Sequence, residues 1–324
     1  MNIEQNIFSM KDPRKELMTF DDSCIDLLVT APPAFAMTGK ESIGTSYSWE
    51  NFDEYIDYMG TVFTEVYRVL KNQHYCVINI GDTTTRIGDR QWDKKTYHLA
   101  AHFINLLEWI GFTYVTEYVT DKGRKSIPNK WSSAYFPFMV TPVSSLEHVL
   151  VFVKKDNKDT PVSCPRCGSD NVGHWGYNKK GDRQWVCKNR NCPGNCFGVG
   201  PVYTEVGKII NSRKIDDNII QNELVDRWSR GVVQVSPMFS KETDQRYLPA
   251  EVTEMAVLFY SGVGDVVLDP FSGVGTTLMT AIKDKRRFVC FERDEYDRKL
   301  FLGGLLAFRK RIEKVNTEIS CEAK

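Results

Sequence analysis

The chain lacks long apolar runs and has no excess of charge of either sign. None of its 324 residues lies in a stretch approaching the roughly 18 consecutive apolar residues of a membrane-spanning helix. Its N-terminus shows no apolar secretory segment. Forty-two Lys and Arg balance 42 Asp and Glu, which excludes a uniformly basic nucleic-acid protein but not a local basic patch. We therefore expect a cytoplasmic protein that makes no membrane contact.

A disulfide framework is also not expected, because nine cysteines are an odd number in a chain without an export signal. The cysteines are unevenly placed, and five of them crowd between Cys164 and Cys196. Apolar residues make up 42% of the chain and charged residues 26%, which is ordinary for a globular protein. The length suggests two domains, or one large domain with an insert.

Short β-type runs alternate with amphipathic helical patterns on both sides of the cysteine-rich segment. This alternation predicts an α/β fold with a doubly wound, mostly parallel sheet. The expected strands are Ile25–Thr30, Tyr75–Ile80, Phe112–Val119, His148–Val153, Asp265–Leu268 and Phe288–Phe291. The expected helices are Asn51–Leu70, His98–Trp109, Pro249–Tyr260, Thr276–Lys283 and Glu295–Lys314. Ligands of such sheets bind at the carboxyl ends of strands, so two strand ends with unusual sequences form the candidate site.

A glycine loop follows the late strand that ends at Asp269. In LDPFSGVGTT, Gly273 and Gly275 allow a sharp turn before a helix opens at Thr276, and the free N–H groups of that helix favour nucleotide-type ligands. Glu292 lies 19 positions after Gly273, close to the spacing of about 20 for an acid that binds ribose hydroxyls. The loop has neither a GK[ST] ending nor a third glycine. We therefore predict a nucleoside ligand without a pyrophosphate.

The loop LDPFSGVGTT resembles the S-adenosylmethionine loop of the DNA amino-methyltransferases. The stretches EVYRVLKNQHYCVINIGD, EHVLVFVKK and RYLPAEVTEMAVLFYSGVGDVVLDPF are also similar to that family. The resemblance implies the circularly permuted β-class order, in which Asn6–Met10 lies beside the C-terminal strands in one methyltransferase sheet. It further implies an S-adenosylmethionine site formed by Asp12, Thr30, Asp269, Pro270, Phe271, Ser272, Gly273, Gly275, Thr276, Thr277 and Glu292.

The early strand ends in VTAPPAF, where the family places a [D/N/S]-P-P-[Y/F/W] tetrapeptide. Cytosine-N4 enzymes show S-P-P-Y or S-P-P-F at this point. The resemblance implies that the catalytic tetrapeptide is Ala31, Pro32, Pro33 and Ala34. In the family, the first side chain and a backbone carbonyl accept the two N–H bonds of the target amine, and the aromatic fourth residue stacks on the flipped base.

Both chemically informative positions of this tetrapeptide are alanine. Ala31 cannot accept a hydrogen bond, a loss that we expect to cost about 10²–10³ in rate, by analogy with oxyanion-hole donors. Ala34 offers no stacking face, which weakens base capture by about 1–3 kcal/mol. Two explanations fit: natural divergence into a non-catalytic homologue, or a deliberate Ser-to-Ala and Tyr-or-Phe-to-Ala change that traps a complex. The intact remainder of the motif set favours the second.

The cysteine-rich segment has the spacing of a metal site. Cys164-x₂-Cys167 and Cys187-x₄-Cys192 are separated by 19 residues, which suits two thiolate pairs around a tetrahedral Zn²⁺. Four thiolates leave no open position, so the predicted zinc is structural. Cys196 is an alternative to Cys192 as the fourth ligand, and a set of free thiols is the simpler alternative to any metal.

The same segment is locally basic. Residues 154–214 hold 12 Lys and Arg against 5 Asp and Glu, interleaved with aromatic residues, a pattern that suits DNA contact. The alternative is a solvated ribbon whose aromatic residues pack its own small core. The candidate DNA-binding residues are Lys179, Lys180, Arg183, Lys188 and Arg190. We expect residues 156–235 to form a zinc-ribbon recognition insert between a catalytic half, 1–155, and a cofactor-binding half, 236–324.

The sequence therefore predicts a transfer of a methyl group from S-adenosylmethionine to cytosine N4 in double-stranded DNA, with little activity left in this chain. Thr30 and the wording PFSGVGTT favour cytosine N4, while adenine N6 stays an alternative because residue 31 is alanine. The sequence is also compatible with a non-catalytic DNA-binding homologue, an RNA methyltransferase and a small-molecule methyltransferase. The resemblance implies a bacterial, archaeal or phage-encoded protein, monomeric or homodimeric, with a cognate restriction endonuclease as a partner in function only.

Overall fold

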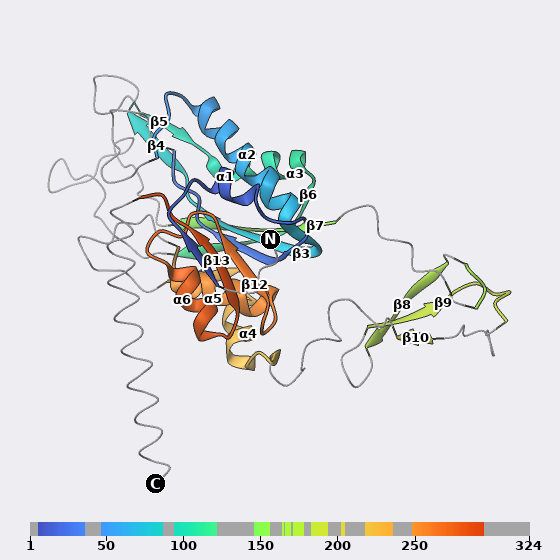
Figure 1. Cartoon of the computed structure of the whole chain (residues 1–324). Helices are drawn as coiled ribbons and strands as arrows, with labels where there is room; N and C mark the ends of the chain where they lie inside the picture. Colours follow the sequence, from blue (N-terminus) through green and yellow to red (C-terminus); the bar gives the residue numbers. More distant parts are fainter. Residues whose placement is uncertain are drawn as a thin grey trace, which may run out of the picture. The chain divides into compact units, whose positions relative to one another are not determined.

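The computed structural model describes residues 6–35, 47–86, 94–121, 146–155, 164, 166–169, 171–177, 183–193, 202–204, 218–235 and 248–294. The chain divides into two compact units. The main unit comprises Met1–Lys155 and Asn222–Lys324, and the insert comprises Asp156–Gln221 (Figure 1). The chain thus leaves the main unit after Lys155 and returns to it at Asn222.

An eight-stranded mixed sheet forms the centre of the main unit. Its order is β1 (Ile7–Ser9), β13 (Arg287–Phe291), β12 (Val266–Asp269), β2 (Ile25–Thr30), β3 (Leu70–Ile80), β7 (Leu146–Lys154), β6 (Phe112–Asp121) and β11 (Val232–Gln234). Among these strands, β7 alone runs antiparallel to its neighbours. The predicted doubly wound, mostly parallel α/β fold is confirmed, and the N-terminal segment joins the C-terminal strands through β1.

Helices cover both faces of this sheet (Figure 1). On one face lie α1 (Pro13–Leu17), α2 (Phe52–Val69) and α3 (Leu99–Ile110), and on the other lie α4 (Asn222–Trp228), α5 (Ala250–Tyr260) and α6 (Thr276–Lys283). Side chains alternate between the two faces of each strand. Leu28 and Ile78 therefore pack on the α2–α3 side, while Leu27 and Val77 pack on the α5 side. All six residues of β2 are buried, as its continuous apolar run indicates.

Helix α2 carries clear start and stop signals. The Asn51 side chain caps its first turn by accepting a hydrogen bond from the Glu54 amide at 2.9 Å. At the other end the ammonium of Lys154, which is buried, donates to the Tyr67 and Leu70 carbonyl oxygens, both at 2.8 Å. A cation at the C-terminus of a helix satisfies carbonyls that lack partners within the helix.

Some elements differ from the sequence expectation. Strand β3 begins at Leu70 rather than Tyr75, because α2 passes into it without a loop. A separate two-stranded sheet, β4 (Thr83–Arg86) with β5 (Lys94–Tyr97), was not predicted, since its threonines and lysines show no apolar alternation. Helices α1 and α4 and strand β11 were also not predicted. The expected helix Glu295–Lys314 lies outside the described residues.

The insert contains an antiparallel three-stranded sheet of β8 (Val172–Tyr177), β9 (Arg183–Cys187) and β10 (Val202–Thr204). It ends at Gln221, earlier than the predicted boundary at residue 235. The reason is that β11 pairs in parallel with β6 and extends the main sheet, so residues 222–235 belong to the main unit.

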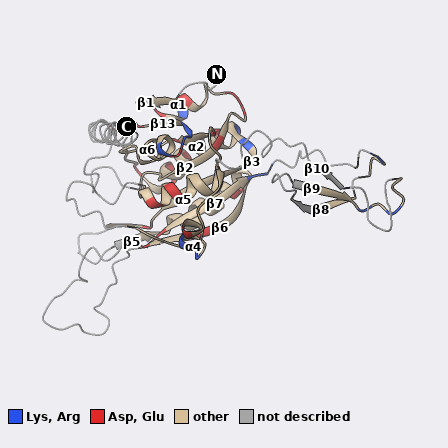
Figure 2. Ribbon diagram, turned by 90° about the horizontal axis from the view of Figure 1, so that it is seen from below, with Lys and Arg blue, Asp and Glu red and all other residues tan. Residues whose placement is uncertain are grey.

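Both signs of charge occur along the ribbon of the main unit (Figure 2), in line with the balanced total. Across the ranges that the structure describes, no helix combines the length and the apolar character that crossing a bilayer requires.

Candidate functional site

The carboxyl ends of β2 and β12 are adjacent in the sheet. Their register pairs Leu28 with Leu268, so the segments that follow Thr30 and Asp269 leave the sheet side by side. The Thr30 hydroxyl donates to Asp269 Oδ1 at 2.6 Å, and both side chains are buried. The Pro-Pro turn and the glycine loop, which are far apart in the sequence, therefore start from one edge of the sheet.

The Asp269 carboxylate is held by three donors. Besides the Thr30 hydroxyl at Oδ1, the Thr277 hydroxyl donates to Oδ2 at 2.6 Å and the Phe271 amide donates to Oδ1 at 3.1 Å. Burial raises the pKa of Asp269 to about 6, although the same three hydrogen bonds favour the ionised form and lower it. Thr30 and Thr277, both expected to contact a cofactor, thus use their hydroxyls to position Asp269.

The glycine loop has the backbone geometry that its sequence suggests. Gly273 and Gly275 have φ values of 52° and 83°, in the left-handed region where a glycine avoids strain. The Ser272 amide donates to the Phe291 carbonyl at 2.9 Å, which ties the loop to β13. Gly275 is the N-cap of α6, and Thr276 is its first residue. The loop therefore presents free backbone N–H groups at a helix start beside the end of β12.

Glu292 closes the loop from the end of β13. Its side chain is buried, and its Oε2 accepts a hydrogen bond from the Gly273 amide at 2.7 Å. Oε1 accepts from the Asp294 amide at 2.7 Å, and the backbone amide of Glu292 donates to the Ser9 carbonyl at 3.0 Å. The acid expected to bind a ribose thus lies directly against the glycine loop.

Asp12 follows β1 and caps helix α1. Its Oδ1 accepts from the Arg14 amide at 3.0 Å, and its Oδ2 pairs with the Arg14 guanidinium at 2.6 Å. Burial by itself would raise the pKa of Asp12, but the hydrogen bonds and charge of Arg14, together with the charge of Arg293, outweigh burial and lower it. Asp12 is therefore ionised, and it lies close enough to Arg293, which follows Glu292, to feel its charge.

A group of aromatic residues lines the same region, and the sequence analysis did not single it out. Tyr47 packs edge to face on Phe271 of the glycine loop, with ring centroids 5.9 Å apart. The guanidinium of Arg293 lies 4.5 Å from the centre of the Tyr47 ring, and Arg14 lies 4.4 Å from that of Tyr58. The signal that indicates this group is the run of Tyr and Trp residues between the Pro-Pro turn and α2.

The Pro-Pro tetrapeptide leaves the sheet at the end of β2. Ala31 is half-buried against the α5 side of the core, Pro32 is buried, Pro33 is half-buried and Ala34 is exposed. Phe35, the next residue, is 1% exposed and packs against other aromatic rings of the core. It therefore does not replace the missing aromatic side chain of residue 34.

A polar pair lies at the end of the neighbouring strand β3. The Asn79 amide nitrogen donates to Glu147 Oε2 at 2.7 Å, while Asn79 Oδ1 is buried without a hydrogen-bond partner. Asn79 follows Ile78, the register partner of Thr30, so it lies next to Ala31 in the sheet. A buried acceptor without a partner is uncommon in proteins, which makes Asn79 a candidate contact for a bound molecule. No sequence pattern indicated this role.

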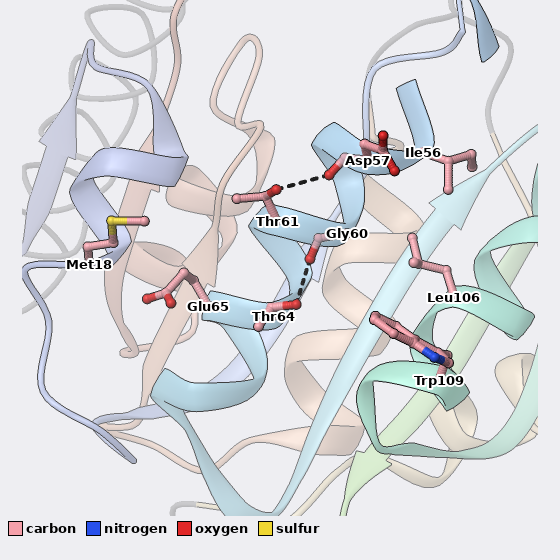
Figure 3. Close-up of a pocket in the computed structure, with 9 residues that line it drawn as sticks. All are labelled: Met18, Ile56, Asp57, Gly60, Thr61, Thr64, Glu65, Leu106 and Trp109. Atoms are coloured by element: carbon pink, nitrogen blue, oxygen red, sulfur yellow. Dashed lines mark hydrogen bonds between the residues drawn. The ribbon is translucent and has the colours of Figure 1, made fainter. Parts of the chain in front are cut away.

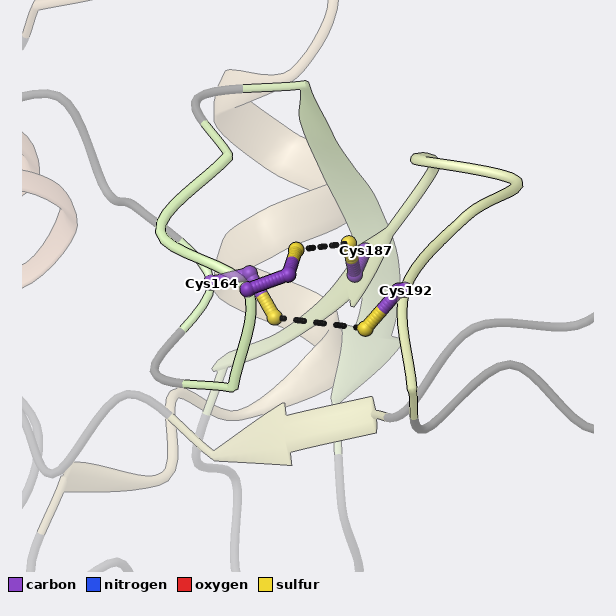
Figure 4. A group of neighbouring side chains, drawn as sticks. Cys164, Cys187 and Cys192 are labelled. Carbon is purple, nitrogen blue, oxygen red and sulfur yellow. Dashed lines mark hydrogen bonds between the residues drawn. The ribbon is translucent and has the colours of Figure 1, made fainter.

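In the insert, the four predicted ligands Cys164, Cys167, Cys187 and Cys192 come together, with their sulfurs within 4.8 Å of one another (Figure 4). Cys164 and Cys192 are 3.8 Å apart, and Cys167 and Cys187 are 3.7 Å apart. Those separations far exceed a disulfide bond of about 2.05 Å. They match the roughly 3.8 Å between sulfurs around a tetrahedral Zn²⁺ with bonds of about 2.3 Å. Cys196 lies outside the described residues.

The candidate DNA-binding residues of the insert are only partly covered by the structure. Lys188 and Arg190 are exposed and follow β9, and Arg183 is the first residue of that strand. Lys179 and Lys180 lie outside the described residues. The structure therefore places three of the five residues on or directly after one strand of the small sheet.

A hollow of about 500 Å³ lies elsewhere in the main unit (Figure 3). It is lined by residues of α2 and α3 and by Met18, which is 62% exposed, and Trp109, which is 83% exposed. The hydroxyls of Thr61 and Thr64 on its wall donate to carbonyls of their own helix. The hollow is formed by outer helix surfaces and not by the strand ends described above.

Comparisons with known proteins give a consistent result. A family model described as DNA methylase matches residues 25–301. The type II methyltransferase M.MjaI of Methanocaldococcus jannaschii is 26% identical over 236 residues, which are 72% of this chain and 62% of that protein. The type II methyltransferase M.SmaI of Serratia marcescens is 31% identical over 97 residues, which are 29% of this chain and 33% of that protein. The chain thus spans less than two thirds of the length of these relatives.

Two solved structures share the fold of the chain. One is the DNA modification methylase TTHA0409 of Thermus thermophilus in complex with S-adenosyl-L-methionine, with a TM-score of 0.59, 21% identity, and coverage of 91% of this chain and 92% of that one. The other is the cytosine-N4-specific PvuII DNA methyltransferase, with a TM-score of 0.51, 15% identity, and coverage of 90% and 86%. Identities this low show the fold alone, and they confirm the predicted methyltransferase fold.

Proposed function

Because the chain belongs to the DNA methylase family, we propose that it is a DNA methyltransferase that uses S-adenosylmethionine and acts on cytosine N4 in duplex DNA after base flipping, with activity impaired by Ala31 and Ala34. The observation that carries the proposal is the buried hydrogen bond of 2.6 Å between Thr30 and Asp269. It brings the turn expected to hold the target amine and the loop expected to hold the methyl donor to one edge of the sheet.

The residues at this edge suit the cofactor. S-adenosylmethionine supplies a methyl group bound to a positively charged sulfur. The left-handed glycines Gly273 and Gly275 allow close approach of the backbone, and Glu292 offers a buried carboxylate for ribose hydroxyls. The Asp269 carboxylate, fixed by three donors, keeps the Phe271 amide and the helix start in place. Asp12 contributes a negative charge at the end of β1.

The target amine needs two acceptors, because its lone pair is delocalised into the base ring. Pro32 and Pro33 would fix the backbone carbonyl that accepts one N–H bond, as the family resemblance implies. Ala31 removes the other acceptor, and Ala34 removes the stacking platform for an extruded base. The resemblance of VTAPPAF and PFSGVGTT to cytosine-N4 enzymes favours cytosine over adenine N6.

We also propose that the insert binds one structural Zn²⁺ and contacts DNA. The four sulfurs are spaced like the corners of a tetrahedron around zinc, and all four cysteines are free of disulfides. The Asn189 amide lies 3.6 Å from Cys167 Sγ, as expected of a donor that stabilises a thiolate. Lys188 and Arg190 are exposed beside this centre and suit contacts to phosphates.

The experiment that tests the proposal restores the tetrapeptide. Ala31→Ser with Ala34→Tyr should transfer labelled methyl groups from S-adenosylmethionine to duplex DNA, with Ala31→Ser contributing about 10²–10³ in rate. Chromatography of the digested nucleosides should show N4-methylcytosine. The two single variants serve as matched controls, and the double variant carrying Asp269→Asn should lose cofactor binding.

Three results would contradict parts of this proposal. A restored protein that binds both S-adenosylmethionine and DNA but transfers no methyl group would leave the competing function, a DNA-binding homologue without chemistry, which Ala31 and Ala34 favour. N6-methyladenine in the digest would replace cytosine as the target. Preference for RNA in a competition binding assay would replace DNA as the substrate. The oligomeric state, the cytoplasmic location and a cognate restriction endonuclease stay predictions.

A further inference from the structure

The β4–β5 hairpin rises from the carboxyl edge of the main sheet, next to the Pro-Pro turn (Figure 1). Strand β4 starts two residues after the end of β3, and β5 leads through His98 into α3. His98 Nδ1 is 2.7 Å from Asp82 Oδ2, so the residue before the hairpin is hydrogen-bonded to the residue after it. This contact fixes the base of the hairpin on the edge that carries the candidate site.

The hairpin also packs directly on the segment that follows the tetrapeptide. The ring of Tyr97, the last residue of β5, lies 4.9 Å from that of Phe35 and 4.6 Å from that of Phe52. Phe35 is 1% exposed, so this aromatic contact is part of the core. Phe35 is the residue next to Ala34, and a rigid contact therefore links the position expected to face an extruded base to the hairpin.

The outer part of the hairpin offers donors for an anion. Thr84 and Thr96 are exposed, and their hydroxyls are 3.0 Å apart across the ladder. Lys95 is exposed, and its ammonium lies 4.6 Å from the centre of the Tyr97 ring. In the part of the chain that the structure describes, no carboxylate pairs with this ammonium. Arg68, in contrast, pairs with both Asp22 and Glu65.

The register of the hairpin adds a second sign of an anionic partner. The last pair of its ladder joins Arg86 and Lys94, two basic residues at directly opposed positions. Like charges opposite each other destabilise an antiparallel pair, and a bound anion would relieve this cost. Hydroxyl, ammonium and guanidinium groups are the donors that proteins use to bind phosphate oxygens.

We propose that the β4–β5 hairpin contacts backbone phosphates of duplex DNA beside the extruded base. The inference rests on the proposed function, because only a DNA substrate would bring a row of phosphates to this edge of the sheet. It assigns the main unit a DNA contact of its own, in addition to the one proposed for the insert. A contact to phosphates positions the duplex and carries no sequence preference.

The test measures DNA binding as a function of salt. Lys95→Gln and Arg86→Gln, singly and together, are compared with the wild type by fluorescence anisotropy on labelled duplexes of two unrelated sequences. Each substitution should lower the slope of log K against log salt by about 0.9, and weaken binding at 0.15 M salt about 5-fold, equally on both duplexes. The conservative variant Lys95→Arg should keep the wild-type slope.

Lys285→Gln is the matched control. Lys285 is exposed in the turn before β13, at the opposite, amino-terminal edge of the same sheet, and its replacement removes the same charge. It should leave the salt slope unchanged. Calorimetric binding of S-adenosylmethionine and thermal unfolding, measured for every variant, show whether the fold and the cofactor site are intact.

The outcomes separate this inference from the proposed function. Hairpin variants that keep the wild-type slope, or a Lys285→Gln variant that loses as much as they do, would overturn the hairpin contact and leave the proposed function standing. A wild-type protein that binds no duplex DNA at any salt concentration would overturn the proposed function itself. A loss confined to one of the two duplexes would also refute the inference, because it would indicate base readout instead of phosphate contact.

Discussion

Replacing Thr30 with Val removes a single hydroxyl from the buried link between the two halves of the site. The two side chains have similar shapes, so the main change is the loss of the hydrogen bond of 2.6 Å to Asp269 Oδ1. A hydrogen bond to a charged group contributes about 1.5–3 kcal/mol, and burial prevents water from replacing the lost donor. We expect Thr30→Val to lower the free energy of unfolding of the main unit by about 2 kcal/mol.

The effect should depend on pH, because the pKa of Asp269 is about 6. Above pH 6 the carboxylate is ionised in the folded wild type, and the lost hydrogen bond has its full cost. Below that pH the carboxyl group is protonated in both proteins, so the difference in stability narrows. Removing a donor to the ionised form also raises the pKa of Asp269 further in the variant.

Thermal unfolding by calorimetry at pH 8 and pH 5 measures both effects. For a unit of this size, 2 kcal/mol corresponds to a decrease of roughly 4–8 °C in Tm. Thr30→Ser keeps a hydroxyl and should stay near the wild type. Thr277→Val removes the donor to the other oxygen of the same carboxylate. The double variant should cost less than the sum of the two at pH 7, because protonation of Asp269 limits the loss.

A Thr30→Val protein within about 0.5 kcal/mol of the wild type at pH 8 would refute the role of this hydrogen bond. A difference of equal size at pH 5 and pH 8 would refute the ionised state of Asp269 as its cause.

Four further predictions follow from particular contacts. Burial raises the folded pKa of Asp269 above its unfolded value, so its contribution to the free energy of unfolding falls, by up to about 1.4 kcal/mol per pH unit, as the pH rises from about 4 to 6; calorimetric titration should show this slope in the wild type and not in Asp269→Asn. Burial would raise the pKa of Asp26, but the His74 and Lys71 hydrogen bonds outweigh it and hold the pKa well below 3.8, so the stabilisation from Asp26 is present above about pH 4 and lost below it, and Asp26→Asn should flatten the acid limb of a pH-dependent unfolding curve. Lys154→Met leaves two buried carbonyls without a donor and should lower the midpoint of urea unfolding by the equivalent of about 2–3 kcal/mol, whereas an unchanged midpoint would contradict the capping role. Elemental analysis should find one zinc per chain, and Cys187→Ser should lose it while the Tm of the main unit stays constant.

Local patterns in the sequence were sufficient to predict the fold class and most of the sheet. The run Ile25–Thr30 is apolar throughout, which is typical of a strand covered on both faces, and the structure buries every residue of it. The loop after Asp269 was equally clear, because two left-handed positions require glycine and Gly273 and Gly275 occupy them. The four cysteines came together as their spacing indicated, since each pair lies within a few residues of chain.

Other features depended on contacts between distant segments. Strand β11 has only three residues, and its membership of the main sheet follows from pairing with β6, so the boundary of the insert was placed too late. The β4–β5 hairpin has no apolar pattern, and the packing of Tyr97 on Phe35 places it beside the site. The unpartnered oxygen of Asn79 is a property of the folded core and has no counterpart in a one-dimensional pattern.

The sequence by itself determined the types of elements and the chemistry available at their ends, because periodicity, glycine positions and cysteine spacing are local properties. Only the tertiary structure decided which ends meet. The pairing of β2 with β12 turns the hydroxyls of Thr30 and Thr277 toward Asp269, where they support the site. Sheet order is set by the burial of whole faces against helices, and this energy is shared among residues hundreds of positions apart.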